Sequence, residues 1–329
     1  MPALPAPEPR MSRPATSAPP HAELRAALET VLGGRVEALE RRPYEYRTSY
    51  SIDALDVALS DGRNVHLLLK DLGAPSETAR QAKPSFLHDP LREIDVYRRI
   101  LAGRGLGTAE CYGAVVDEDQ GRYWLFIEHV PGIELWQVGE LEIWEQVARW
   151  LAELHTTCGD VEQDHLLRYD RDLYETWLRR ALAGSAAAAL QRVAAGYETV
   201  VRRLLDLPTT FIHGEFYPSN VLVESRPEGK RVCPIDWEMA AVGPGLLDLA
   251  ALTAPGGWSD DERERILLAY YHALRSPPPP AEFLEASECC RLHVALQWLG
   301  WAHDWSPPAE HAQDWLAEAL RAAAKLELV

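Results

Sequence analysis

The sequence predicts an α+β protein in which strands dominate the N-terminal part and helices dominate the rest of the chain. Five short segments before residue 130 are rich in β-branched and aromatic residues and are separated by turn signals. From residue 139 to 205, and again after residue 244, apolar residues recur at helical spacing. The 329 residues, 47% of them hydrophobic, are enough for one large domain or two lobes.

The N-terminal part begins with a segment that has no periodicity. Residues 1–20 are rich in Pro, Ala and Ser, so we expect a disordered tail. A helix is predicted over His21–Leu32, because Gly33-Gly34 suits a helix C-terminus. Asp61-Gly62 is a strong hairpin signal between two strands. The strands predicted here are Val36–Leu39, Ser51–Leu59 and Asn64–Lys70.

A second helix is predicted over Asp89–Leu101, with Asp89 as N-cap and Pro90 at the first helical position. The preceding connection, Gly73–His88, is longer than most and is expected to be mobile. Two more strands, Glu110–Val116 and Tyr123–His129, precede Pro131-Gly132, where the chain can reverse.

The C-terminal part is predicted to be mostly helical. The segments with helical spacing are Leu141–His155, Asp172–Leu182, Ala187–Leu205, 244–252, Asp260–Leu274, Glu282–Trp301 and Pro308–Leu326. The run Pro277–Pro280 is expected to be a rigid break. Trp298, Trp301 and Trp305 fall on one helical face, where spacing favours core packing over a wall that stacks on substrate.

The charge, the cysteine usage and the absence of certain motifs argue against several classes of partner and of binding site. Acids outnumber bases 50 to 33, giving a net charge of −17, so neither nucleic acid nor an anionic membrane surface is an expected partner. A cationic substrate is compatible with this charge. The five cysteines contain no C-x-x-C, which favours free thiols in a reducing cytoplasm. Walker-type and H-E-x-x-H motifs are absent, and no signal peptide or membrane span is indicated.

One hairpin carries the candidate chemistry. Two apolar strands, Asn220–Glu224 and Arg231–Ile235, flank a turn that contains Pro227 and Gly229. Glu215 and Asn220 precede the first strand and Asp236 follows the second, so pairing brings the three together. Asn220 and Asp236 offer the oxygen ligands that Mg²⁺ prefers, and Glu215 can accept a proton. The alternative, a turn cap with solvated acids, is less consistent with this spacing.

The motif H-G-E-x-x-x-x-N, followed by I-D-W-E, resembles the catalytic and metal motifs of the aminoglycoside phosphotransferase and choline kinase-like family. The resemblance covers about residues 35–300. It implies a two-lobed protein kinase-like fold, with an antiparallel N-lobe (21–130) that binds nucleotide and a helical C-lobe (131–329) for catalysis and the acceptor. It also implies ATP and Mg²⁺ as cofactors.

The resemblance assigns roles around the hairpin. Asn220 and Asp236 would hold magnesium, and Glu215 falls where the family has its catalytic aspartate. Glutamate is one methylene longer, so the hydroxyl would sit further out, or the substitution marks weakened activity. Glu238 would be a second-metal or supporting residue, and Asp248 would support the catalytic loop through its backbone.

The resemblance also places the nucleotide. Lys70 would contact the phosphates and Glu93 would hold Lys70, although a strand-end lysine is otherwise solvated and an early acid stabilises a helix start. Ser49 and Thr48 belong to the loop expected over the phosphates. Backbone groups from Glu128 to Val130 would hydrogen-bond adenine. 

The function expected from these features is ATP- and Mg²⁺-dependent transfer of the γ-phosphate to a hydroxyl of a small molecule, an amino sugar or amino alcohol. The alternative is a nucleotide-binding pseudokinase with a regulatory or scaffolding role, which the Glu215 substitution motivates. A protein kinase is disfavoured, because H-G-E replaces H-R-D and no A-P-E follows Asp236. The sequence leaves open the individual acceptor, the phosphorylated position, the choice of ATP over GTP and the oligomeric state.

Overall fold

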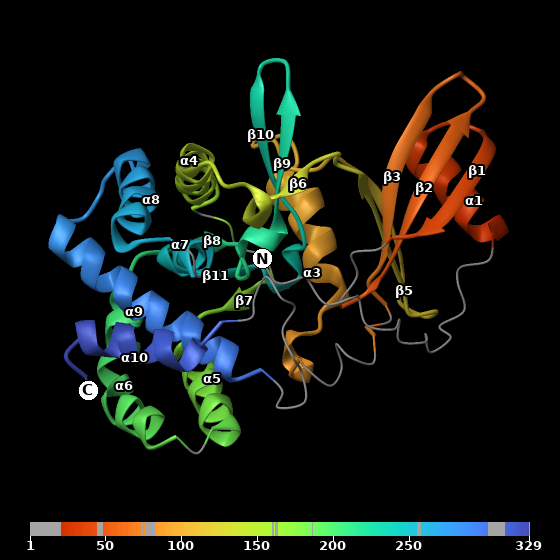
Figure 1. The fold of residues 1–329 in the computed structure, drawn as a ribbon. Helices are drawn as coiled ribbons and strands as arrows, with labels where there is room; N and C mark the ends of the chain where they lie inside the picture. Colours follow the sequence, from red (N-terminus) through yellow and green to blue (C-terminus); the bar gives the residue numbers. More distant parts are fainter. Residues whose placement is uncertain are drawn as a thin grey trace, which may run out of the picture.

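The computed structural model describes residues 21–44, 49–73, 75–76, 83–159, 161, 164–185, 187–254, 258–301 and 313–328. The tail expected at 1–20 lies outside the described residues, as do Thr48 and Trp305. The α+β class predicted from the sequence is confirmed, with one large antiparallel sheet in the N-terminal part and helices in the C-terminal part (Figure 1).

The N-terminal part is built on a five-stranded antiparallel sheet with the strand order β1-β2-β3-β5-β4. Its strands are β1 (Val36–Pro43), β2 (Ser51–Leu59), β3 (Asn64–Asp71), β4 (Cys111–Asp117) and β5 (Arg122–Glu128). All five were predicted, and the bounds of β2 coincide with the prediction. Strand β1 continues four residues beyond the predicted end at Leu39, because Leu39–Pro43 stay paired with β2.

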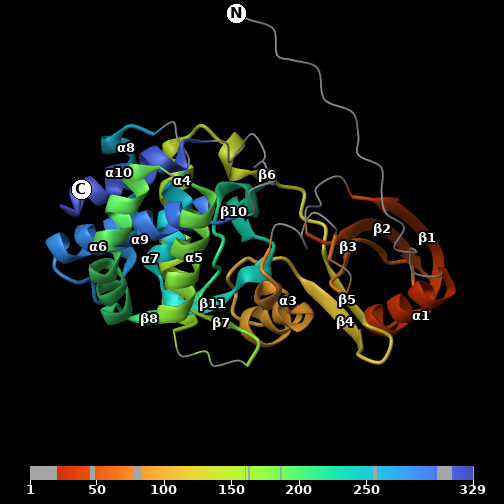
Figure 2. The same ribbon diagram turned by 90° about the horizontal axis from the view of Figure 1, so that it is seen from below.

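Two helices cover the sheet on opposite faces (Figure 2). Successive side chains of a strand point to opposite faces. Leu69 and Phe126 therefore pack with helix α1 (His21–Leu32), whereas Leu125 packs with Ile94 of helix α3 (Pro90–Asp95). Lys70 pairs with Leu125 in the sheet register and shares its face. The alternation thus directs the Lys70 side chain toward α3.

The predicted helix Asp89–Leu101 is divided in the structure. Asp89 caps α3, accepting a hydrogen bond from the Leu91 amide at 2.9 Å, and Pro90 is its first residue, as predicted. From Val96 to Leu101 the chain continues as a wider π-helical turn, η2. A local widening of this kind leaves the apolar pattern almost unchanged, so the sequence did not reveal it.

Helices dominate the C-terminal part. They are α4 (Leu141–Thr157), α5 (Arg171–Gly184), α6 (Ala188–Asp206), α7 (Leu246–Thr253), α8 (Asp260–Ala273), α9 (Pro280–Leu299) and α10 (Trp315–Lys325). Each corresponds to a predicted helix. Two bounds need correction. Pro280, expected within a rigid break, is the first residue of α9, a position where a missing amide hydrogen costs nothing. Asp314, expected inside the last helix, is the N-cap of α10. The predicted start at Pro308 lies outside the described residues.

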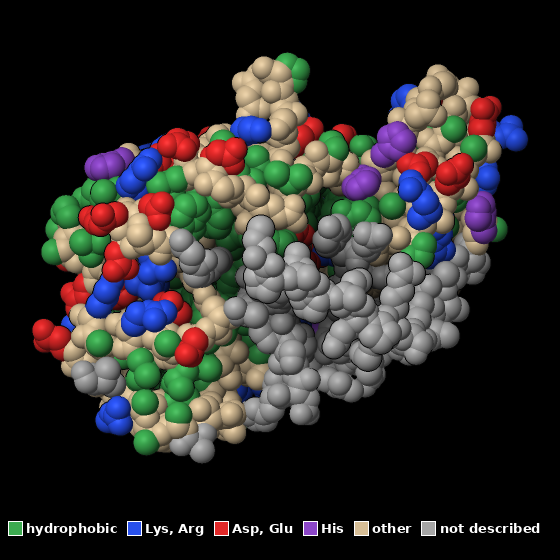
Figure 3. All heavy atoms as spheres, in the orientation of Figure 1, with side chains coloured by type: hydrophobic (Ala, Val, Ile, Leu, Met, Phe, Trp, Pro, Cys, Tyr) green, Lys and Arg blue, Asp and Glu red, His purple; other side chains and the backbone are tan. Residues whose placement is uncertain are grey.

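Two small sheets complete this part. The first has the order β10-β9-β6, and the second has the order β7-β11-β8. Their strands are β6 (Ile133–Glu134), β7 (Leu167–Arg168), β8 (Thr209–Ile212), β9 (Val221–Arg226), β10 (Gly229–Pro234) and β11 (Ala241–Pro244). Only the β9–β10 hairpin was predicted, because strands of two to four residues carry too little pattern. Its tip projects from the surface between the sheet and the helices (Figures 1 and 3).

Short helical turns complete the described elements; they are η1 (Ser85–Leu87), η3 (Leu135–Gln137), η4 (Pro218–Asn220) and η5 (Trp237–Met239). One hydrophobic core runs from α3 and the sheet through α4 to the β9–β10 hairpin. A second core lies among α5, α6, α7, α9 and α10. On the face in Figure 3, acidic and basic side chains are interspersed over the helices. Among the described residues, no helix is long and apolar enough to span a membrane.

Candidate active site

A buried lysine joins the sheet, helix α3 and the hairpin. The Lys70 Nζ atom lies 2.8 and 2.6 Å from the two carboxylate oxygens of Glu93 and 2.8 Å from Oδ1 of Asp236. Lys70 and Glu93 are 5% and 1% exposed. Burial alone would lower the pKa of Lys70, but the charges of Asp236 and Glu93 outweigh it and raise that pKa. The ammonium therefore stays charged.

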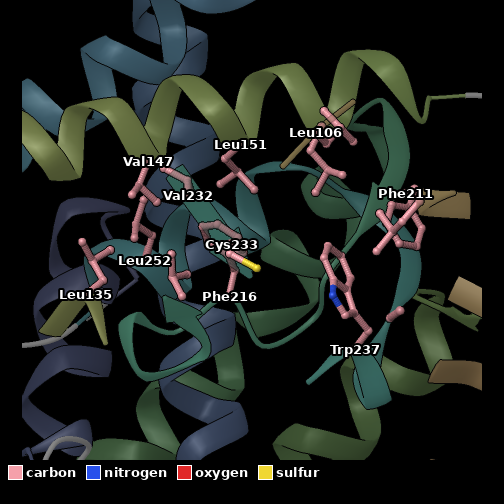
Figure 4. Close-up of a cluster of buried hydrophobic side chains, with 14 of the residues drawn as sticks. Leu106, Leu135, Val147, Leu151, Phe211, Phe216, Val232, Cys233, Trp237 and Leu252 are labelled. Atoms are coloured by element: carbon pink, nitrogen blue, oxygen red, sulfur yellow. The ribbon is translucent and has the colours of Figure 1, made fainter. Parts of the chain in front are cut away.

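Asp236 occupies an uncommon backbone conformation. Its φ is +65° and its ψ is 62°, the left-handed region that residues other than glycine seldom adopt. The next residue, Trp237, is fully buried, stacks on Phe211 at 5.7 Å, and donates its amide to Glu93 Oε1 at 3.4 Å. Figure 4 shows Trp237 and Phe211 together in the core beneath α4. The anchored indole holds Asp236 in this conformation.

Asp248 supports the loop that carries Glu215 through hydrogen bonds to the loop backbone. The Asp248 carboxylate accepts the backbone amides of His213, at 2.6 Å, and Gly214, at 2.9 Å. Gly214 has φ +84°, and a Cβ there would lie 2.1 Å from the carbonyl oxygen of Met239. Glycine is therefore required at this position. The expected support of the loop by Asp248 through the backbone is present.

His213 is a structural member of the same loop. Its Nε2 lies 2.9 Å from the Ile235 carbonyl, and its Nδ1 accepts the Glu215 amide at 3.3 Å. Nε2 therefore carries the proton and the ring is neutral. Burial lowers the pKa of His213, which agrees with a neutral ring. His155, expected to pack structurally, is also buried and lies 3.3 Å from Asp248.

Backbone pairing brings Glu215, Asn220 and Asp236 to one end of the hairpin. The Ile235 amide donates to the Asn220 carbonyl at 2.9 Å, so Asn220 faces the residue before Asp236. The Asn220 side-chain amide donates to the Glu215 carbonyl at 2.9 Å. The buried neighbours Phe216 and Trp237 anchor both ends of this arrangement in the core (Figure 4). The convergence expected from the sequence is therefore present in the backbone.

Glu215 has an environment suited to proton transfer. The residue is 9% exposed, and burial raises its pKa to about 7. The positive charge of Lys83 opposes this rise, whereas Glu238 and Asp236 add to it. A carboxylate with a pKa near the working pH is poised to accept a proton.

Glu238 receives two side chains from the N-terminal part. Ser49 Oγ donates to Glu238 Oε1 at 2.7 Å, and Lys83 Nζ forms a close ion pair with the same oxygen. The Arg92 guanidinium, from α3, donates to the Glu238 backbone carbonyl at 2.6 Å. Ser49 thus lies beside Glu238; the contact of its loop with phosphates stays a prediction, and Thr48 lies outside the described residues.

The expected adenine segment passes between the two parts of the protein. The Glu128 carboxylate accepts the Arg231 guanidinium at 2.7 Å, which lowers its pKa, so this side chain supports the hairpin. The backbone amide of Glu128 donates to the backbone carbonyl oxygen of Glu110 at 2.8 Å. Val130 is buried, and its carbonyl accepts the Gly132 amide at 2.9 Å. Recognition of adenine by this segment stays a prediction.

Two functional candidates were not found from the sequence. Lys83 is a single lysine before a proline in a long connection, and Arg92 is one basic residue in a helix. Neither has a local signal, because their partners come from tertiary structure. Trp298 and Trp301, whose spacing favoured the core, are 8% and 7% exposed, which agrees with core packing.

The donor set suits magnesium bound together with phosphate. Asn220 and Asp236 supply an amide oxygen and a carboxylate, and the Asp236 side chain is 28% exposed, so a ligand can reach it. Within the described chain, no group of three or more His, Cys, Asp or Glu side chains could hold a metal alone. Magnesium usually takes one or two protein oxygens, with water and phosphate completing its shell.

Comparison with known proteins decides the family. A sequence profile described as the phosphotransferase enzyme family matches residues 57–284. The chain belongs to the phosphotransferase enzyme family. The family supports an enzyme that transfers a phosphoryl group to a small molecule, as the sequence predicted. No curated protein sequence matches the chain significantly.

Solved structures confirm the two-lobed kinase-like fold. A choline/ethanolamine kinase family protein from Mesorhizobium loti is 19% identical, with a TM-score of 0.58 and 93% of each chain covered. The choline kinase LicA from Streptococcus pneumoniae is 17% identical, with a TM-score of 0.56 and 94% of this chain and 99% of that chain covered. An aminoglycoside phosphotransferase from Streptomyces rimosus, solved with ADP and streptomycin, is 16% identical, with a TM-score of 0.51 and coverage of 78% and 92%.

Proposed function

We propose that this phosphotransferase family member transfers the γ-phosphate of ATP, with Mg²⁺, to a hydroxyl of an amino sugar or amino alcohol. The observation that carries the proposal is the contact of Lys70 with both Glu93 and Asp236, at the end of the hairpin where Asn220 and Glu215 also lie. It joins a charged phosphate-binding group to the oxygen donors of a magnesium site.

Each residue has a distinct part in the proposed reaction. Lys70 contacts the phosphates, and Glu93 fixes the ammonium in position. Asn220 and Asp236 hold Mg²⁺, which neutralises charge on the phosphate oxygens when bound. Glu215 accepts the acceptor hydroxyl's proton as its oxygen forms a bond to the γ-phosphorus, while the bond between that phosphorus and the oxygen bridging to the β-phosphate breaks. ADP leaves with both electrons of the broken bond.

A cationic acceptor is supported by the charges around the base. Glu215, Glu238 and Asp236 are carboxylates that influence one another electrostatically, and the chain carries a net charge of −17. Such a field attracts an ammonium group. Solved structures with similar folds include choline kinases and a phosphotransferase bound to streptomycin, which supports amino alcohols and amino sugars as the first acceptors to examine.

The direct test is acceptor-dependent turnover. The protein would be incubated with Mg²⁺-ATP and separate amino sugars and amino alcohols, with ADP release and the phosphorylated product followed by mass spectrometry. We expect one acceptor class to give product with the wild type and none with Asp236→Asn. Equal product formation by Asp236→Asn would contradict the assignment of the site.

A further inference from the structure

Lys83 crosses from the N-terminal part to the acidic end of the hairpin. Its ammonium forms an ion pair with Oε1 of Glu238, and its side chain is only 10% exposed. The charges of Glu238, Glu215 and Asp236, in that order, oppose burial and raise its pKa. Lys83 is therefore a fixed positive charge beside Glu238, within electrostatic reach of the two carboxylates proposed for catalysis, Glu215 and Asp236.

The oxygen of Glu238 that Lys83 contacts is already saturated. Ser49 Oγ donates to the same Oε1 at 2.7 Å. Arg92 holds the Glu238 backbone carbonyl at 2.6 Å, which fixes the residue from behind. Two donors on Oε1 leave that oxygen poorly placed to bind a metal ion as well, so a metal ion at Glu238 would depend on the other carboxylate oxygen and would still lie beside the Lys83 ammonium.

Apart from Glu215, the charges at this end of the hairpin form two unequal groups. Lys70 is shared by two carboxylates, those of Glu93 and Asp236, so this group carries one uncompensated negative charge. Glu238 and Lys83 form a neutral pair. A divalent cation is therefore favoured at Asp236, whereas at Glu238 it would meet the like charge of Lys83.

We infer that the Lys83 ammonium occupies the place of a second metal ion at Glu238, so this site holds one divalent cation for each bound nucleotide. Protein kinases of related fold hold two magnesium ions around the phosphates. Here a lysine would provide the second positive charge. The inference rests on the proposed function, because it presumes that nucleotide and metal bind at this hairpin.

The test is to count metal ions. The protein would be dialysed to equilibrium against Mn²⁺ and the non-hydrolysable analogue AMP-PNP, with bound Mn²⁺ and bound nucleotide both measured. We expect one Mn²⁺ per nucleotide in the wild type and in Lys83→Arg, and two in Lys83→Met. Electron paramagnetic resonance would show spin coupling between the two ions only in Lys83→Met, because paired metal sites lie about 4 Å apart.

Lys230→Met is the matched control, since Lys230 is an exposed lysine on β10. It should keep a ratio of one. A ratio of two in the wild type would overturn the inference, and this result needs no variant. A ratio of one in Lys83→Met, with nucleotide still bound, would also overturn it. If the wild type bound no nucleotide, the proposed function itself would fail, which is a distinguishable result.

Discussion

Lys70 Nζ lies 2.8 Å from an Asp236 carboxylate oxygen while it also contacts both carboxylate oxygens of Glu93, at 2.8 and 2.6 Å. The three residues come from β3, helix α3 and the end of the β9–β10 hairpin. This contact holds the proposed phosphate-binding lysine, Lys70, directly beside the proposed metal ligand, Asp236. Removing the lysine charge leaves the buried carboxylate of Glu93 and the partly exposed carboxylate of Asp236 without their cation.

Lys70→Met should strongly reduce turnover, by about 10²-fold or more, because it removes a preorganised positive charge from the phosphates. Glu93→Gln keeps the size of the side chain but loses the charge that holds Lys70, so we expect a smaller loss. Steady-state kinetics with a responsive acceptor measures both. Lys230→Met, which changes an exposed lysine, should behave like the wild type, and equal losses in Lys70→Met and this control would contradict the assignment.

Activity should fall as the pH drops below about 7 if Glu215 is the base. Burial raises the pKa of Glu215 to about 7, so below this pH the group is protonated and cannot accept the hydroxyl proton. A pH profile of kcat/KM measures this directly. Above pH 7, Glu215→Gln should lose at least about 10²-fold, the usual size of a general-base contribution, and the difference from the wild type should shrink as the pH falls.

The Glu215→Asp variant distinguishes a native protein that is an active enzyme from one that has lost its catalytic activity. If the longer side chain is functional, the aspartate variant should keep part of the turnover and the fall at low pH. If Glu215→Asp creates turnover that the wild type lacks, the native protein is not a catalyst and the pseudokinase alternative would be favoured.

Asp248→Asn should destabilise the protein and lower its activity. The buried carboxylate accepts two backbone amides, from His213 and Gly214, and an asparagine has only one acceptor oxygen. An unsatisfied buried donor costs about 1–3 kcal/mol, so we expect a loss of that size in the free energy of unfolding. Denaturant unfolding checks this, with Asp206→Asn, an exposed residue at the end of α6, as a control within about 0.5 kcal/mol of the wild type.

Local patterns predicted much of the fold. Strand β2 was predicted with the bounds Ser51 and Leu59; its second half, Leu55–Leu59, alternates buried and less buried residues, and the hairpin signal Asp61-Gly62 follows it. Helix α3 was found through its Asp89 cap and Pro90. The short strands β8 and β11 were missed, because four residues carry neither a period nor a turn signal of their own.

The candidate site was predicted only where a motif carried it. Glu215, Asn220 and Asp236 stand close to one another in the sequence, and pairing of two recognisable strands brings them together. Lys83 meets Glu238 across 155 residues, through a long connection without periodicity. Only tertiary structure reveals such a contact, since a lone lysine in a loop is ordinarily solvated.

Stability should fall in acid through His293. This buried histidine lies 2.7 Å from the Tyr197 hydroxyl, and burial lowers its pKa from 6.5 to about 3. Between pH 6.5 and pH 3, His293 therefore binds a proton in the unfolded chain but not in the folded protein, so the free energy of unfolding decreases as the pH falls through this range. The contribution is about 1.4 kcal/mol per pH unit, or about 3 kcal/mol between pH 7 and pH 4.

His293→Gln cannot titrate but keeps a polar group near Tyr197. The difference in unfolding free energy between pH 7 and pH 4 should be smaller in this variant by about 3 kcal/mol. Denaturant titrations at the two pH values measure it. The same pH dependence in both proteins would show that His293 does not carry the acid sensitivity.

The most direct test of the central claim is calorimetric binding of ATP, with and without Mg²⁺, to the wild type and to Asp236→Asn. If Lys70, Asn220 and Asp236 form the nucleotide and metal site, the wild type should bind ATP more tightly with Mg²⁺, and Asp236→Asn should lose this magnesium dependence. Magnesium-dependent binding that persists unchanged in Asp236→Asn, or no binding of ATP by the folded wild type, would contradict the account.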